Sequence, residues 1–425
     1  MKEKKISVGI LGFGGRGISM AKAIEAFPDE IYVKAIAEPN EKRKQKAIKN
    51  YGVAEEYAFN DYNEFLSKGV IVDLLMITTM DNFHYEPLMK ALELGYKNIL
   101  LEKPIAPTLD ECLEMTEATK KYDANVIILH SLRYNLYYRK MKEIVESGEI
   151  GRVMGIRHVE GASLMNYSHS FVRGNWANTK DSAPLIMAKS CHDTDIITYI
   201  TGKKFKKISS LGSLVYFTEE NAPEDSAARC TECKYKNECM YSTIPLYSKK
   251  GHEPWFGSAV GKDGYATIEE AAAKGEYGRC VYKCDNNLVD NQVMNFEFED
   301  GTTGTFTVTA FDSGRRTEVQ GTLYTLFGHE GEGTIKLRNQ IGGNIDKIYD
   351  AYSESSTTID HYGTDVQLVK ELIEFINDGV GTNLSFIDGA LHSHLACFAA
   401  EVAREEERVV YMKEFENVAK DDQNE

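Results

Sequence analysis

Residues 6–18 read Ile-Ser-Val-Gly-Ile-Leu-Gly-Phe-Gly-Gly-Arg-Gly-Ile, and this stretch decides the fold. An apolar run over residues 6–11 predicts a strand, and a helical pattern begins at Ile18. Between them lies a G-x-G-x-x-G turn made of Gly12, Phe13, Gly14, Gly15, Arg16 and Gly17. Such a turn lets the backbone approach a pyrophosphate, which the N–H groups at the start of the helix then bind. We predict a dinucleotide site here, the alternative being a glycine-rich turn that serves geometry alone.

An acidic residue stands where the second strand ends. Glu38 follows the glycine turn by about 20 residues, the position at which a carboxylate binds a ribose 2′-hydroxyl. A carboxylate would repel a 2′-phosphate, so the sequence favours NAD over NADP. Lys42 and Arg43 lie close enough to Glu38 to weaken the preference for NAD, so NADP remains the alternative cofactor.

The N-terminal part of the chain alternates short apolar runs with amphipathic segments. This alternation predicts parallel strands joined by right-handed helical crossovers, in a doubly wound Rossmann domain over residues 1–128. The predicted strands are 6–11, 32–37, 72–78, 99–101 and 126–129, and the predicted helices are 18–27, 41–51, 85–94 and 109–122.

After about residue 150 the sequence pattern changes and predicts longer strands, separated by turn signals such as Asp300-Gly301. We predict a second, α+β domain over residues 129–425, with a large and mostly antiparallel open sheet, a cysteine-rich insertion at about 225–285 and a disordered tail at 420–425. A chain of 425 residues suits two domains. The predicted strands are 153–161, 208–217, 293–299, 303–311, 317–327 and 333–337, and the predicted helices are 186–200 and 391–404.

Charge and composition exclude several classes of partner. The formal net charge of -16 disfavours a nucleic acid or an anionic membrane, because both require clustered Lys and Arg. No apolar run approaches the roughly 20 residues of a membrane helix. We therefore expect a cytoplasmic protein, in which the eight cysteines are thiols or metal ligands rather than disulfides.

A lysine follows the fourth predicted strand, in the run Glu102-Lys103-Pro104. It stands at the carboxyl end of a strand, where ligands bind in open α/β sheets. Together with the glycine turn, Thr79, His84, Leu132-Arg133-Tyr134 and a later histidine segment, this run resembles the Gfo/Idh/MocA family of oxidoreductases. The resemblance extends over nearly the whole chain.

The resemblance implies NAD(P) held by the glycine turn, Glu38, Thr79, His84, Glu102 and Lys103. It also implies a catalytic lysine at Lys103 and a catalytic histidine at His192. The histidine stands in residues 188–195, Ala-Lys-Ser-Cys-His-Asp-Thr-Asp. Family members commonly carry an aspartate at the position of Ala188, and Pro-Asn where this chain has Met80-Asp81.

Helical spacing places Lys189, His192 and Asp195 along one face, so we predict all three to be catalytic. Lys189 or Asp193 would then do part of the work of the missing aspartate. The alternative for His192 is a packed, hydrogen-bonded histidine. We assign deprotonation of a substrate hydroxyl to His192 and stabilisation of the alkoxide to Lys103, with exchanged roles as the alternative.

A polyhydroxylated substrate needs bidentate polar groups and an aromatic face. The segment 169–176 offers such groups, and the alternative is a loop that packs against its own domain. The predicted substrate-binding residues are Arg133, Arg173, Asn175, Trp176 and Asp193.

The insertion contains a C-x-x-C pair, Cys230 and Cys233, with Cys239 six positions later. Four thiolates bind zinc tetrahedrally and would stabilise a loop poor in apolar residues. We predict a structural zinc site with Cys280 as the fourth ligand and Cys284 as the fallback. Free thiols or a redox pair are the alternative.

These features predict an enzyme that transfers hydride between NAD(P) and a secondary alcohol of a sugar, sugar derivative or cyclitol. A redox-neutral, NAD-dependent glycoside hydrolase and a nicotinamide-binding sensor without activity are the alternatives. We further expect a homodimer or homotetramer formed through the C-terminal sheet, over the strands from residue 293 to residue 337.

Overall fold

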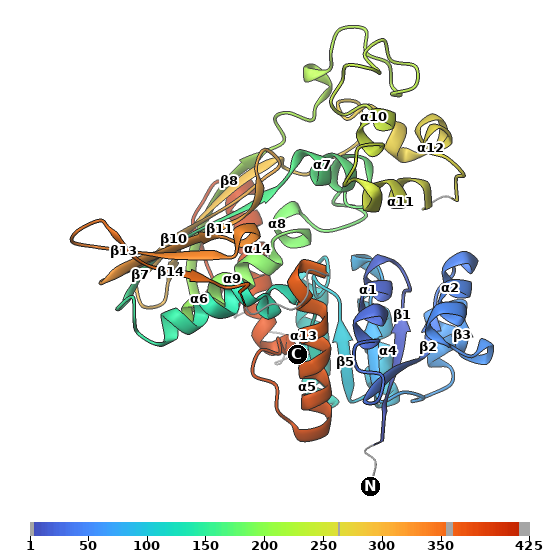
Figure 1. Ribbon diagram of the computed structural model, residues 1–425, viewed down its shortest axis with the longest axis horizontal. Helices are drawn as coiled ribbons and strands as arrows, with labels where there is room; N and C mark the ends of the chain where they lie inside the picture. The colour runs from blue at the N-terminus through green and yellow to red at the C-terminus, as the bar shows by residue number, and fades with distance from the viewer. Residues whose placement is uncertain (1–3, 262–263, 354–359, 416–425) are drawn as a thin grey trace.

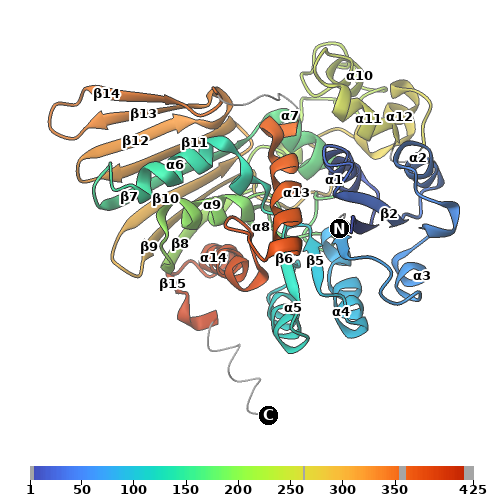
Figure 2. The same ribbon diagram turned by 60° about the horizontal axis from the view of Figure 1, so that its bottom comes forward.

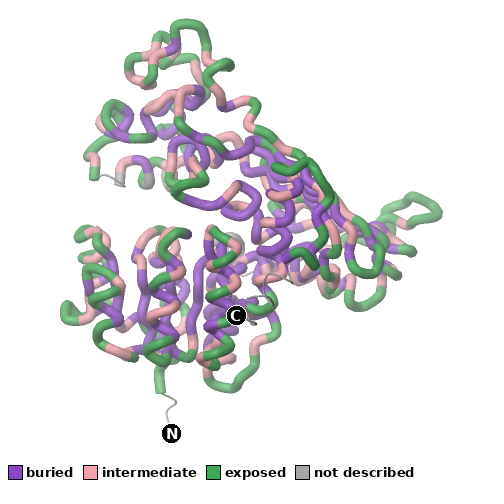
Figure 3. Tube along the Cα trace, turned by 180° about the vertical axis from the view of Figure 1, so that it is seen from behind, coloured by how far each residue is buried: buried purple, intermediate pink, exposed green. Residues whose placement is uncertain are grey.

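The computed structural model describes residues 4–261, 264–353 and 360–415, so the predicted tail at 420–425 lies outside the described residues. The chain forms a compact α/β domain and a broad sheet domain that meet along one side (Figure 1). Buried residues are concentrated in the strands and in the helix faces that cover them (Figure 3).

Parallel strands form the N-terminal sheet in the order β3-β2-β1-β4-β5-β6. The order reverses between β1 and β4, and in such sheets the crevice outside the carboxyl ends of the strands at that point binds the ligand. The fold therefore confirms the predicted Rossmann domain. The strands are β1 (Ile6–Leu11), β2 (Ile31–Ala37), β3 (Ala58–Phe59), β4 (Leu74–Ile77), β5 (Asn98–Leu101) and β6 (Asn125–Ile128).

Helices cover both faces of this sheet, and each side has its own apolar core. Residues of α1, α2 and α13 pack on one face, and residues of α3, α4 and α5 pack on the other. Helix α13 arrives from far along the chain to lie beside α1 (Figure 2). The helices are α1 (Gly15–Ile24), α2 (Glu41–Tyr51), α3 (Tyr62–Leu66), α4 (Tyr85–Leu94), α5 (Leu109–Lys121) and α13 (Asp360–Asp378).

The second sheet has the order β14-β13-β12-β11-β7-β10-β9-β8-β15. Among the described strands, β7 and β10 pair in parallel and the other neighbours pair antiparallel, as predicted for a mostly antiparallel sheet. The strands are β7 (Val153–Ala162), β8 (Phe205–Ser213), β9 (Asn291–Phe298), β10 (Thr303–Thr309), β11 (Ser313–Gly321), β12 (Tyr324–His329), β13 (Thr334–Asn339), β14 (Ile345–Asp350) and β15 (Val410–Tyr411).

The prediction of one strand over residues 317–327 is wrong. Strands β11 and β12 are separate and pair antiparallel, with Gln320 opposite Thr325. At Gly321 a Cβ atom would lie 2.1 Å from the carbonyl oxygen of Ile150, so the tight turn needs a glycine there. The alternating pattern continued across this turn, and periodicity alone did not reveal it.

One face of the large sheet is covered by helices and the other is open (Figure 2). The core between sheet and helices includes Met141, Ile196 and Ala400. The covering helices are α6 (Leu136–Glu146), α8 (Leu185–Ala188), α9 (Cys191–Thr201) and α14 (Ile387–Glu405).

The insertion stands above the N-terminal domain at the top of Figure 1 and has a small core of its own, which includes Tyr247, Ile268, Ala271 and Tyr277. The segment that follows β7 forms α7 (Leu164–Asn166) and a π-helix, η4 (Tyr167–Arg173), before the chain reaches α8. Within the described residues, no helix is long and apolar enough to cross a membrane. The helices of the insertion are α10 (Thr243–Tyr247), α11 (Glu253–Gly261) and α12 (Ile268–Lys274).

Candidate active site

The glycine turn lies between β1 and α1 and is open where a pyrophosphate would bind. Gly12 has φ +87°, and a Cβ atom on Gly17 would lie 2.4 Å from the carbonyl oxygen of Gly12. These two glycines are therefore required by the fold itself. A Cβ atom on Gly15 would meet no atom within 4 Å of the described structure, and one on Gly14 would meet only Arg43, at 3.8 Å. This free space beside a helix N-terminus fits a dinucleotide.

The two side chains of the turn have structural contacts. Phe13 is fully buried and meets Tyr51 edge-on, with ring centroids 5.6 Å apart. The guanidinium of Arg16 lies 3.4 Å from Glu102 Oε2 and 3.0 Å from Asp365 Oδ2 of α13. Arg16 thus joins the turn, the end of β5 and a helix from the far end of the chain.

Glu38 lies buried at the end of β2, as predicted. Its Oε1 accepts a hydrogen bond from the backbone N–H of Asn40 (2.9 Å) and lies 3.7 Å from Nη1 of Arg43. A carboxylate held in this way can still accept hydrogen bonds from ribose hydroxyls at its other oxygen.

Thr79 and His84 shape the loop after β4. His84 is fully buried, with Nδ1 2.8 Å from the carbonyl oxygen of Pro104 and Nε2 3.3 Å from that of Thr79. The Thr79 hydroxyl donates to the carbonyl of Phe83 (2.8 Å). His84 therefore connects the loop after β4 with the loop after β5.

Lys103 reaches across the interface between the domains. Its Nζ donates to the carbonyl oxygen of Ala188 at 2.8 Å, and its side chain remains partly exposed. Ala188, the first residue of the histidine segment, thus contacts the predicted catalytic lysine through its backbone. Lys103 is consequently held beside the start of α9.

The predicted continuous helix over residues 186–200 is wrong, because it is divided into α8 and α9. Lys189 ends α8, and Ser190 has φ −112° and ψ 10° before α9 begins. Lys189 Nζ forms an ion pair with buried Glu160 of β7 (3.1 Å). The break removes the shared face on which Lys189, His192 and Asp195 were expected to lie.

His192, in the first turn of α9, is partly exposed. Its Nδ1 is buried and has no hydrogen-bond partner among the described residues. Burial lowers the pKa of the imidazole well below its usual range, and the Lys103 ammonium lowers it further. The ring is therefore neutral at neutral pH and can accept a proton.

The two aspartates of α9 are buried and bound to cations. Asp195 accepts a bidentate pair from Arg133, with 2.7 Å to Nε and 2.6 Å to Nη2. Asp193 accepts from Arg315 Nε at 2.7 Å and lies 2.9 Å from His158 Nε2. Burial opposes ionisation, but Arg315 and His158 hold the pKa of Asp193 at about 2. The structure thus places Arg133, Asp193 and Asp195 in internal ion pairs.

The segment predicted to bind substrate divides into three different environments. Arg173 is 1% exposed and donates to the carbonyl oxygens of Arg279 and Tyr241, both at 2.8 Å, so it supports the insertion and does not line the cleft. Trp176 Nε1 donates to Asp81 Oδ2 of the N-terminal domain (3.0 Å). Asn175 lines a polar groove of about 340 Å³ beside Met80. The prediction was wrong for Arg173, because sequence could not show that this cation is enclosed.

Four of the cysteines face one small cavity of about 20 Å³ in the insertion. Cys284 is not among the lining residues, and its Sγ donates to the carbonyl oxygen of Cys280 (3.2 Å). No disulfide forms between the described cysteines. The lining cysteines are Cys230, Cys233, Cys239 and Cys280.

A second group of potential metal ligands lies beside the predicted catalytic residues. One ligand atom each of His130, Cys191 and His394 lies within 4.8 Å of the others, and all three residues are buried. Across the described part of the chain this is the set of three that meets that distance, and the cysteines of the insertion do not. The sulfur atoms of the cysteines in the insertion are therefore farther apart than they would be around a bound zinc ion.

The comparisons agree with this geometry. Residues 6–130 match the model of the oxidoreductase family GFO/IDH/MocA with its NAD-binding Rossmann fold, and residues 138–238 match the GFO/IDH/MocA C-terminal domain. The two matches together cover more than half of the chain. The protein belongs to the GFO/IDH/MocA family.

Named relatives of this family are similar over part or all of the chain. Inositol 2-dehydrogenase of Corynebacterium glutamicum is 28% identical over 218 residues, 49% of this chain and 60% of the relative. Scyllo-inositol dehydrogenase of Lactobacillus casei, solved with NAD(H) and scyllo-inositol, has a TM-score of 0.64 at 18% identity and covers 96% of this chain and 100% of that one. An Agrobacterium radiobacter oxidoreductase, solved with NAD+, L-tartaric acid and magnesium, has a TM-score of 0.68 at 14% identity, with coverage of 96% and 99%.

The matches to the first curated relatives span from 40% to 66% of those relatives' own length. The solved structures extend over almost the whole chain, and at such low identity they establish the fold. The chain is thus a GFO/IDH/MocA protein with an NAD-binding Rossmann domain.

Sequence reasoning missed several residues of this GFO/IDH/MocA site. His130 follows β6 at the carboxyl edge of the sheet, and the rule that selected Lys103 after β5 would have selected it too. Glu160, Arg315 and Asp365 carried no such signal, because they come from strands and a helix whose positions depend on tertiary packing.

Proposed function

We propose that this protein is an NAD-dependent dehydrogenase that oxidises a secondary alcohol of a sugar, sugar derivative or cyclitol. The observation that carries the proposal is the hydrogen bond from Lys103 to Ala188, which brings an ammonium beside the neutral imidazole of His192. An alcohol oxidation needs a base for the hydroxyl proton and a cation for the developing alkoxide. The inositol dehydrogenases among the relatives support this substrate class.

Each side chain then has one task. NAD, when bound, supplies the hydride acceptor. His192 accepts the hydroxyl proton at Nε2, since its Nδ1 is buried. Lys103 donates one N–H to the carbonyl oxygen of Ala188 and has two more N–H groups that can stabilise the alkoxide oxygen. The buried pairs Arg133–Asp195 and Arg315–Asp193 fix the helix that carries His192.

Glu38 supports NAD as the preferred cofactor. It is buried and anchored by a backbone N–H, so it cannot move away from a 2′-phosphate without leaving a buried acceptor group. Arg43 lies 3.7 Å from Glu38 and is the cation that would accommodate NADP.

The decisive experiment combines calorimetry of NAD and NADP binding with a screen of sugars, cyclitols and aryl glycosides. A dehydrogenase accumulates NADH with substrate. Release of an aglycone with no net NADH would establish the redox-neutral hydrolase instead. Binding of NAD with no turnover over the whole panel would favour a sensor, and no binding of either cofactor would refute the proposal.

We also propose a structural zinc site at Cys230, Cys233, Cys239 and Cys280. Support comes from the common cavity that these side chains line. Binding of zinc would draw the sulfur atoms together and hold the insertion closed. Metal analysis of untagged protein should give about one zinc per chain, and Cys284→Ser should retain it.

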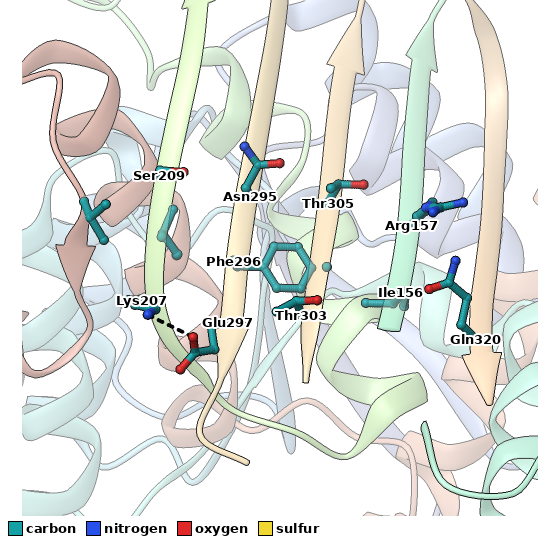
Figure 4. Close-up of a pocket in the computed structure, with 13 residues that line it drawn as sticks. Ile156, Arg157, Lys207, Ser209, Asn295, Phe296, Glu297, Thr303, Thr305 and Gln320 are labelled. Atoms are coloured by element: carbon teal, nitrogen blue, oxygen red, sulfur yellow. Dashed lines mark ion pairs between the residues drawn. The ribbon is translucent and has the colours of Figure 1, made fainter. Parts of the chain in front are cut away.

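The open face of the large sheet is our candidate for self-association. Figure 4 shows side chains of β8, β9, β10, β7 and β11 there, with Lys207 and Glu297 forming an ion pair. They surround a shallow hollow of about 440 Å³. A twofold interface would place this face of the sheet against the same face of a second copy. Sedimentation velocity should show a dimer or tetramer, and a monomer at micromolar concentration would refute this assignment.

A further inference from the structure

Two buried nitrogen atoms next to the predicted catalytic centre lack hydrogen-bond partners in the described structure. They are Nε2 of His130 and Nδ1 of His192. The two rings are neighbours, with centroids 5.7 Å apart and planes inclined at 62°. Unpartnered polar atoms are costly in a protein interior, and two of them on adjacent rings call for an explanation.

The contacts of His130 decide which of its nitrogens carries the proton. Nδ1 lies 3.2 Å from Asp195 Oδ1 and 2.9 Å from the hydroxyl of Ser385. A lone pair on Nδ1 would face a carboxylate that Arg133 keeps ionised, so the proton belongs on Nδ1. The lone pair of His130 is then on Nε2, the atom without a partner.

We propose that His130 is a positioning residue for His192, and that its Nε2 lone pair accepts the Nδ1–H of His192 when substrate is bound. This inference rests on the proposed dehydrogenase function. The chain Arg133–Asp195–His130 would fix the His192 tautomer in which Nε2 is free to accept a proton. Hydrogen bonds of this kind are often long before substrate binds and shorten in the complex.

Only one proton changes place in this arrangement. The substrate hydroxyl proton moves to His192 Nε2 and makes the ring an imidazolium. Its Nδ1–H stays on His192 and is stabilised by His130, while Asp195 remains ionised. The His130–Asp195 pair thereby supplies the negative partner that Ala188 cannot provide.

The same cluster could be read as a metal site with Cys191 and His394, and its contacts argue against that. Nε2 of His394 already accepts the backbone N–H of Ile105 at 3.0 Å, and its Nδ1 lies 2.9 Å from the carbonyl oxygen of Ala390. The lone pair that a metal would need on His394 is in use.

The first test is independent of turnover. Nitrogen NMR of the ¹⁵N-histidine-labelled protein at neutral pH should show His192 protonated on Nδ1 and His130 protonated on Nδ1. In Asp195→Asn, Arg133 retains the amide oxygen and the NH₂ group turns toward His130. His130 should then carry its proton on Nε2, and His192 should switch to the Nε2–H form. Wild-type His192 protonated on Nε2, or an Asp195→Asn variant with both rings unchanged, would overturn the proposal.

The second test uses steady-state kinetics with whichever alcohol the screen identifies. His130→Leu should lower kcat by about 10²- to 10⁴-fold with KM nearly constant, the range expected when a base loses its orientation. His130→Gln restores an acceptor oxygen and should recover part of that loss. Equal kcat values for Gln and Leu would contradict the assignment, as would a stoichiometric metal that His130→Leu releases.

A matched control separates positioning from stability. His158 forms a similar buried pair with the other aspartate of α9, 2.9 Å from Asp193 Oδ1, but its ring neighbours are Tyr138 and Phe306 rather than His192. His158→Gln should lower the melting temperature about as much as His130→Gln and leave the His192 nitrogen signals in place. If the wild type forms no NADH with any alcohol, the proposed dehydrogenase function is refuted. The NMR experiment would still test the role of His130 in that case.

Discussion

The glycine turn and the histidine segment differ in where their geometry comes from. The turn is specified by six consecutive residues between one strand and one helix, and each required glycine contacts backbone within that unit or the adjoining β4 loop. The surroundings of His192 come from β5, β6, β7, β11 and α14. A local motif can be recognised from sequence, whereas a site assembled from distant elements requires the fold.

The break between α8 and α9 illustrates the difference. The sequence from 186 to 200 has the hydrophobic spacing of one helix, but Ser190, with φ −112° and ψ 10°, leaves the helical conformation and α9 begins at Cys191. Helix propensities of ordinary residues differ by well under about 1 kcal/mol each, so they did not reveal this break. The side chains on either side of it are bound by distant partners, Lys189 by Glu160 and Asp195 by Arg133.

The largest effect should come from Lys103→Met, which tests whether the assembled site does chemistry separate from the turn. The substitution removes the ammonium and its bond to Ala188 and leaves the glycine turn intact. We expect kcat to fall by about 10³-fold or more, with the Kd for NAD changed by less than about threefold. Stopped-flow NADH formation and calorimetry measure the two quantities, and retained turnover would exclude Lys103 as a catalytic group.

A smaller effect should follow from Gly15→Ala, which tests the turn alone. The added methyl group enters open space, so the free energy of unfolding should stay the same or rise by about 0.5–1 kcal/mol. NAD affinity should fall by roughly tenfold or more, about 1.4 kcal/mol, because the methyl group occupies the pyrophosphate side. Gly17→Ala is the contrasting variant, since its Cβ meets the Gly12 carbonyl and should cost about 1–3 kcal/mol of stability. Unchanged affinity in Gly15→Ala would contradict the assigned pyrophosphate position.

Glu38→Gln should shift cofactor preference. The amide still accepts the Asn40 N–H and no longer repels a 2′-phosphate, while Arg43 gains freedom to bind one. We expect the ratio of kcat/KM for NADP to that for NAD to rise about tenfold, equivalent to about 1.4 kcal/mol. In the double variant Glu38→Gln/Arg43→Gln, the kcat/KM ratio should return toward its wild-type value. An unchanged ratio in Glu38→Gln alone would contradict the prediction that Glu38 binds the ribose.

The last prediction concerns stability rather than activity or binding, and is a dependence on acid. Burial lowers the pKa of His392 from 6.5 to about 4 and that of His394 to about 3. Below about pH 6.5 the unfolded chain binds protons that the folded chain excludes, so stability falls as pH decreases toward 4. Each histidine contributes up to about 1.4 kcal/mol per pH unit in that window. Urea unfolding of His392→Gln should show a flatter pH dependence than wild type, and equal slopes would refute the role of burial.

Much of the fold could be predicted from sequence because strand and helix periodicities persist in the Rossmann domain and in most of the large sheet. The positions of Lys103 and Glu38 followed from the rule that ligands bind at the carboxyl ends of parallel strands. Arg173 was misplaced because a buried and an exposed arginine look alike in sequence. His130 and Arg315 were not selected because their importance depends on what lies opposite them in space.

Helix α13 has a consequence for how this protein is made. Asp365 of this helix pairs with Arg16 in the first phosphate-binding turn, and Leu368 and Leu372 complete the apolar core under that turn. During translation the N-terminal domain emerges from the ribosome long before these residues exist. Arg16 must therefore wait until a further 349 residues have been synthesised before its partner Asp365 exists.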